Sequence, residues 1–110
     1  MSTSEDTLDL LEQLLLARGP GGQEEEVRDI CQRLLGPLCD EFSVDAAGNL
    51  IGVLRAPQAA EGAIRVMAHL DEIAMVVKRI EESGALRVFA LGGAYPVNFG
   101  MCPVDILGDH

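Results

Sequence analysis

Apolar positions recur with a helical period at the start of the chain. Leu8, Leu11 and Leu15 follow one another at intervals of three and four residues, which predicts a first helix. Ser4 can cap the start of this helix. The run "RGPGG", residues 18–22, ends it, because Pro and Gly interrupt helices and favour turns. We interpret this run as a linker.

A second helical pattern follows the linker. The acidic residues 24–26 suit the positive end of a helix dipole and mark its start. The apolar positions after them form one wide face: Val27, Ile30, Cys31, Leu34, Leu35 and Leu38. Gly36 and Pro37 should disturb the last turn.

Beyond residue 40 the pattern becomes typical of β-structure. "EFSVDAAGNLIGVLR" predicts a hairpin with its turn at residues 47–49, and "APQAAEG" predicts a surface loop. The nearly continuous apolar run "AIRVMAHL", residues 63–70, is typical of a strand inside a sheet covered on both faces. Further strands are predicted at "IAMVVKRI", "ALRVFAL" and "VDIL", residues 73–80, 85–91 and 104–107.

This order gives two helices followed by about six or seven strands. Two helices are too few to cover both faces of such a sheet, and the last strand has no evident partner. Unpaired strand edges tend to associate with other chains. The pattern therefore indicates a chain that is incomplete as written, or one that must associate.

Charge and cysteine content narrow the classes of function. The formal net charge of −10 argues against binding to nucleic acid or to an anionic membrane surface. No apolar run is long enough to span a bilayer, and the acidic start lacks the basic region of a signal peptide. Three cysteines without a CxxC pair suggest free thiols in a reducing, cytoplasmic compartment.

The candidate catalytic or metal-binding residues lie in "VMAHLDEIAMVV". This apolar run is interrupted by His69, Asp71 and Glu72. On a strand, His69 and Asp71 point to the same face, where a carboxylate can fix the tautomer of a metal-ligating histidine. Taken alone, such a triplet is more often a structural histidine beside a carboxylate. Zinc also needs three or four protein ligands, and no second ligand cluster is evident.

Other enzyme classes have weaker support. No GxSxG, Walker A or GxGxxG motif is present, and we interpret Glu81 and Glu82 as turn residues. A glycosidase needs two carboxylates that flank one bond. Asp71 and Glu72 are the available pair, but adjacent strand residues point in opposite directions.

Four motifs taken together carry a resemblance. "RGPGGQEEEVRDI", "VDAAGNLIGV", "VMAHLDEIAMVVKRI" and "GALRVFALGGAYP" follow in the order and spacing of the M42 family of metallo-aminopeptidases, the relatives of glutamyl aminopeptidase. The chain resembles this family from about residue 8 to about residue 107. The resemblance implies an α/β fold. Residues 1–72 would be the N-terminal part of a zinc-exopeptidase-like catalytic domain, with two helices and then a mixed sheet. Residues 73–110 would begin an inserted, β-rich oligomerisation domain, which is incomplete here.

The resemblance also implies an activity and a site. Family members remove the N-terminal residue of a peptide with two divalent metal ions, zinc or cobalt, and a glutamate as general base. By position, His69 would be a metal ligand and Asp71 the supporting catalytic carboxylate. The implied partners are a peptide substrate and further copies of the chain in a large closed homo-oligomer.

Some family features cannot be placed in this chain. The remaining metal ligands and the general base lie further downstream in the family, and His110 does not match the family's final histidine. Ala74 replaces a usual glycine, and "GMCPVDILGDH" departs from the common pattern. We therefore expect an N-terminal fragment that is inactive alone and holds at most one zinc ion weakly. The alternative is a non-catalytic, self-associating module derived from this family.

Overall fold

The computed structural model describes residues 4–56 and 62–108. It divides the chain into two compact units, Met1–Glu72 and Ile73–His110, and each is described by itself. Whether these units are a catalytic domain and an inserted domain stays a prediction. Most of the "APQAAEG" loop and His110 lie outside the described residues.

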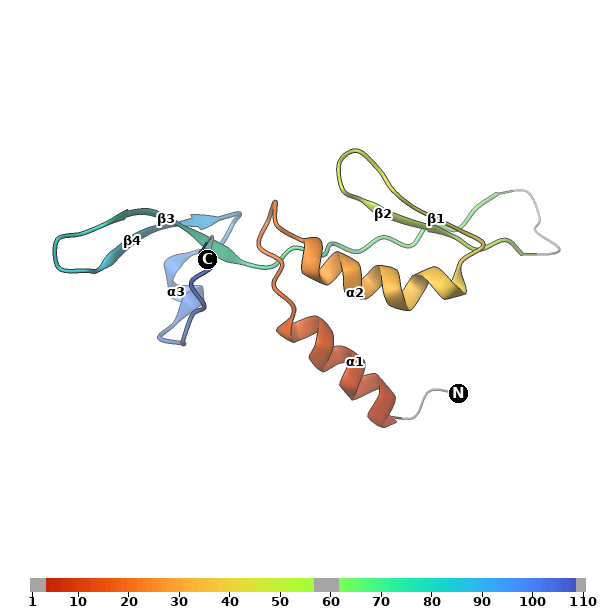
Figure 1. Cartoon of the computed structure of the whole chain (residues 1–110), viewed down its shortest axis with the longest axis horizontal. Helices are drawn as coiled ribbons and strands as arrows, with labels where there is room; N and C mark the ends of the chain where they lie inside the picture. Colours follow the sequence, from red (N-terminus) through yellow and green to blue (C-terminus); the bar gives the residue numbers. More distant parts are fainter. Residues whose placement is uncertain (1–3, 57–61, 109–110) are drawn as a thin grey trace. The chain divides into compact units, whose positions relative to one another are not determined.

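The two predicted helices are present in the first unit. Helix α1 spans Ser4–Leu16, and helix α2 spans Glu25–Leu35 (Figure 1). The Arg33 guanidinium donates a hydrogen bond of 3.0 Å to the side-chain oxygen of Gln13, which links the two helices. As predicted, Gly36 and Pro37 alter the last turn, because a short 3₁₀ helix, η1, spans Gly36–Leu38.

The predicted hairpin follows these helices. Strand β1, Glu41–Val44, pairs antiparallel with strand β2, Leu50–Val53. The turn is closed by Asp45, whose carboxylate accepts hydrogen bonds of 2.9 Å from the backbone N–H groups of Ala47 and Asn49. Helix α2 contacts β2, and the Arg28 guanidinium donates to the carbonyl oxygen of Gly48 at 3.0 Å. One arginine thus ties the helix to the hairpin turn.

The prediction of a buried strand at residues 63–70 was wrong. This segment has no regular secondary structure, and the exposed fractions of Ile64, Val66 and Met67 are 96%, 92% and 89%. A strand is stabilised by hydrogen bonds to a neighbouring strand. No strand of the described residues pairs with this segment, so its apolar side chains face solvent.

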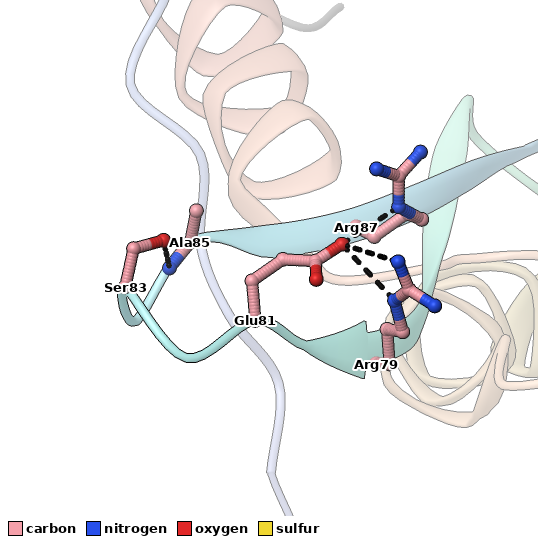
Figure 2. A network of polar contacts seen from close by, with 5 residues as sticks. All are labelled: Arg79, Glu81, Ser83, Ala85 and Arg87. Carbon is pink, nitrogen blue, oxygen red and sulfur yellow. Dashed lines mark hydrogen bonds and ion pairs between the residues drawn. The ribbon is translucent and has the colours of Figure 1, made fainter.

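The second unit contains another predicted hairpin. Strand β3, Ala74–Ile80, pairs antiparallel with β4, Leu86–Leu91, with a register shift between Val77 and Arg79. Figure 2 shows the end of this hairpin, where the Glu81 carboxylate pairs with both Arg79 and Arg87 at 2.8–3.0 Å. Glu81 is thus in a turn, as predicted, and also holds the two strands together.

The end of the chain differs from the prediction in two ways. A short helix that the pattern did not predict, α3, spans Pro96–Phe99, and residues 104–107 form no strand. The described residues therefore contain four strands in two separate hairpins, rather than the six or seven strands that the pattern predicted. The apolar run "VDIL" lacks a pairing partner among them, which explains its irregular backbone.

Burial is concentrated at one place in the first unit. Among the described residues, Ala17 and Val27 are the buried hydrophobic side chains, each 7% exposed. Gly19 is also buried, and an added Cβ there would come within 3.0 Å of a Val27 methyl carbon. The fold is thus a piece of α/β structure, made of helices and small antiparallel sheets. No described helix is long and apolar enough to cross a membrane.

Candidate metal centre

The structure brings the two predicted site residues together. The Nδ1 atom of His69 lies 3.1 Å from Asp71 Oδ1 and 3.0 Å from the Asp71 carbonyl oxygen. Both contacts are satisfied if Nδ1 carries the proton and donates it. That tautomer leaves Nε2 with a free lone pair, which is the form of histidine that ligates metals. Both side chains are open to solvent, with exposed fractions of 86% and 53%.

The next residue is held in a different way. The Glu72 N–H donates to the carbonyl oxygen of Gly19 at 2.7 Å, and the Gly19 N–H donates to Glu72 Oε1 at 2.9 Å. Pro20 and Glu72 form a parallel bridge at the same point. The run "RGPGG" is therefore more than the linker that the sequence suggested, because its backbone binds the end of the segment that carries His69 and Asp71.

The contacts of Glu72 could not be predicted from the sequence. Alternation along a strand indicated that Asp71 and Glu72 point apart, and the two carboxylates do bind different partners, His69 and Gly19. This arrangement does not form a pair of carboxylates flanking one bond, as a glycosidase requires. The partner of Glu72 lies 53 positions earlier in the sequence, and no local pattern links the two. A Gly-rich run permits close approach of another backbone, and this was the one available signal.

The described residues fit part of a zinc or cobalt site. His69 offers an imidazole nitrogen, and Asp71 offers a carboxylate within reach of the same ring. Imidazole and carboxylate are suitable ligands for both metals. Within residues 4–56 and 62–108, no group of three or more His, Cys, Asp or Glu side chains comes together. The remaining donors of a complete site would have to come from elsewhere.

Comparison with known protein families identifies one whose model covers the segment with His69 and Asp71. The family model of M42 glutamyl aminopeptidase matches residues 48–110, which is more than half of the chain and includes His69, Asp71 and Glu72. The chain belongs to the M42 family. The sequence resemblance that "VMAHLDEIAMVV" carries is thereby confirmed for this N-terminal portion.

Individual relatives agree with the family. The chain is 39% identical over 89 residues to a candidate aminopeptidase of Acetivibrio thermocellus, a match that covers 81% of this chain and 26% of the relative. It is 32% identical over 91 residues to the lysyl aminopeptidase of Pyrococcus furiosus, with 80% of this chain and 25% of the relative covered.

A solved structure supports the fold. The crystal structure of a TET aminopeptidase from a marine sediment archaeon, Thaumarchaeota archaeon SCGC AB-539-E09, superposes with a TM-score of 0.68 and 32% identity. The match covers 86% of this chain and 26% of that chain. This M42 chain thus spans about a quarter of the length of the relatives that it matches.

Proposed function

We propose that this chain is the N-terminal portion of a metal-dependent aminopeptidase that hydrolyses N-terminal residues from peptides. The observation that carries the proposal is the contact of His69 with Asp71, in a chain that belongs to the M42 family. His69 is the metal ligand, through Nε2, and Asp71 is the supporting catalytic carboxylate that orients the ring. The pair can hold an imidazole in one tautomer without a rearrangement of the backbone.

Two divalent metal ions, zinc or cobalt, belong to the complete protein in this proposal. When bound, such ions polarise a carbonyl group and lower the pKa of water. The residues of this chain orient a donor atom for them. His69 and Asp71 alone cannot hold two ions, since each zinc needs three or four protein ligands. We therefore propose that the isolated 110-residue chain is inactive and binds at most one zinc ion weakly.

The proposed setting is a cytoplasmic homo-oligomer that acts on peptides. The homo-oligomer in this proposal is supported by the solved relative, which is a TET aminopeptidase. Free Cys31, Cys39 and Cys102 suit a reducing compartment. Size-exclusion chromatography of the complete protein and fractionation of the source cells would test these two points.

The catalytic proposal is tested by His69→Ala in the complete protein. Loss of a metal ligand should lower peptide hydrolysis by at least about a hundredfold and reduce the bound metal, measured by elemental analysis. The circular dichroism spectrum should not change, because His69 is 86% exposed and packs on little. Exposed Glu82, replaced by Ala, is the control and should keep its activity. Full activity in His69→Ala would remove the site assignment.

A second candidate is a non-catalytic module that associates with itself. It is favoured by the exposed apolar segment at Ile64, Val66 and Met67, which has no partner strand among the described residues. The two candidates differ in one measurement on the complete protein. A self-associating module without catalysis would be an oligomer that hydrolyses no peptide in the presence of zinc or cobalt.

A further inference from the structure

The segment that carries His69 and Asp71 is held at its C-terminal end by the loop at residues 18–22. From residue 62 to residue 71 it belongs to no helix or strand, and most of its side chains are exposed. Two metal-site residues on an irregular, exposed segment would sample many positions. Useful metal sites hold their donors within about 0.5 Å, which requires support from neighbouring groups. A fixed point close to His69 is therefore needed.

Glu72 provides such a point. Its backbone N–H and its carboxylate bind the carbonyl oxygen and the N–H of the same residue, Gly19, at 2.7 and 2.9 Å. Two reciprocal hydrogen bonds fix orientation as well as distance. One of them has an ionised acceptor, and such bonds are stronger than neutral ones.

Gly19, the partner of Glu72, belongs to the small group of residues that are buried in the described part of the chain. It lies against Val27, which with Ala17 is one of the two buried hydrophobic residues described. An added Cβ at Gly19 would lie 3.0 Å from a Val27 methyl carbon and 3.3 Å from the Leu70 carbonyl oxygen. Leu70 stands between His69 and Asp71, so the small size of Gly19 lets the site segment approach the buried residues.

The loop at residues 18–22 also approaches the Asp71 carboxylate. An ideal Cβ on Gly21 would lie 3.9 Å from Asp71 Oδ2, whereas Asp71 Oδ1 faces the His69 ring. The two oxygens of Asp71 thus face different neighbours, the loop and the imidazole. A shift of Glu72 away from Gly19 would move Asp71 with it, because the residues are adjacent.

We propose that Glu72 is a positioning residue: its paired hydrogen bonds with Gly19 fix Asp71, and through it the His69 ring, for metal binding. This inference rests on the proposed function for its effect on metal. Its structural part, the support of the site segment by the loop at residues 18–22, stands on the hydrogen bonds alone. Glu72 itself contacts neither metal nor substrate in this role.

The test uses Glu72→Ala and Glu72→Gln in the complete protein, with Glu82→Gln as the matched control on an exposed turn. Hydrogen–deuterium exchange of peptides that contain Gly19 reports the support directly. Zinc affinity, measured by competition with a chelating dye, and kcat and KM for peptide hydrolysis report its effect. His69→Ala is measured alongside.

Glu72→Ala should speed exchange at Gly19 about tenfold or more, since a hydrogen bond to a charged group is lost. Zinc affinity should fall about tenfold, as for other groups that orient a ligand, and kcat should fall with little change in KM. Glu72→Gln should restore most of each value, because its amide oxygen can still accept the Gly19 N–H. Glu82→Gln should match the unmodified protein.

Two results would overturn the role of Glu72. One is unchanged exchange at Gly19 in Glu72→Ala. The other is faster exchange at Gly19 with unchanged zinc affinity and kcat. If Glu72→Ala does not fold, Glu72→Gln decides alone: a loss of zinc affinity with normal exchange at Gly19 would contradict a positioning role. Failure of the proposed function looks different, because His69→Ala would then leave zinc affinity unchanged while the exchange at Gly19 still depended on Glu72.

Discussion

At the scale of single residues, spacing predicted the contact that matters most. An interval of two residues placed His69 and Asp71 on one face, and their side chains do meet at 3.1 Å. The two side chains meet although the segment is not a strand. The contact of Glu72 with Gly19 escaped prediction, since it depends on how distant segments pack.

Gly48 is a residue whose identity the backbone requires. Its φ of +85° lies in the left-handed region, and an added Cβ would lie 2.6 Å from Arg28 Nη1. Gly48→Ala should therefore cost about 1–2 kcal/mol, through backbone strain and loss of the Arg28 hydrogen bond. Amide exchange of the hairpin at residues 41–53 should become roughly ten times faster.

Gly36→Ala is the control for this prediction. Gly36 has a right-handed helical backbone, and beyond its chain neighbours and the helix backbone no atom lies within 4 Å of an added Cβ. This substitution should leave exchange unchanged or slow it slightly, because alanine reduces the freedom of the unfolded chain. Equal effects of the two substitutions would show that neither the φ of Gly48 nor its bond to Arg28 matters.

At the scale of elements, local patterns predicted α1, α2 and the two hairpins. The turn of each hairpin is held by contacts between residues that are near in sequence. Asp45 bonds Asn49 in the first hairpin, and Glu81 pairs with Arg87 in the second. The strands predicted at residues 63–70 and 104–107 did not form. Both segments are apolar, but a strand forms only where another strand pairs with it, and no described strand pairs with either segment.

The turn of the first hairpin should respond to acid. The side-chain hydrogen bond from Asn49, followed by backbone N–H donors, lowers the pKa of Asp45 below its ordinary value. A carboxylate with a lowered pKa in the folded state stabilises the fold above its ordinary pKa. This contribution is lost as the pH falls through the lowered value.

Exchange in residues 41–53, corrected for its intrinsic pH dependence, should therefore accelerate in the acidic range below the ordinary pKa of an aspartate. Asp45→Asn keeps an oxygen acceptor but cannot titrate there. It should remove the part of the acid response that belongs to this turn. An identical acid response in Asp45→Asn and the unmodified protein would rule out Asp45 as its source.

At the scale of the whole molecule, little of the apolar surface is buried. Ala17 and Val27 are the buried hydrophobic residues among those described, and both belong to the first unit. In the second unit, Val76, Val77 and Phe89 are 46%, 43% and 64% exposed. Large exposed apolar surfaces promote association.

The isolated 110-residue chain should consequently self-associate at micromolar concentration. Sedimentation velocity would show oligomers or aggregates, and addition of mild denaturant would dissociate them. A soluble monomer with well-dispersed amide signals would contradict this expectation. It would show that the two hairpins and two helices are stable without further partners.

The central proposal is that this M42 chain is an N-terminal portion of a metal-dependent aminopeptidase. Reading the gene beyond the codon for His110 tests this claim most directly. If the proposal is correct, the reading frame continues and encodes the remaining metal ligands and the glutamate general base that the family resemblance implies. A stop codon directly after His110 would contradict it, because this chain alone would then lack the ligands and the general base of such an enzyme.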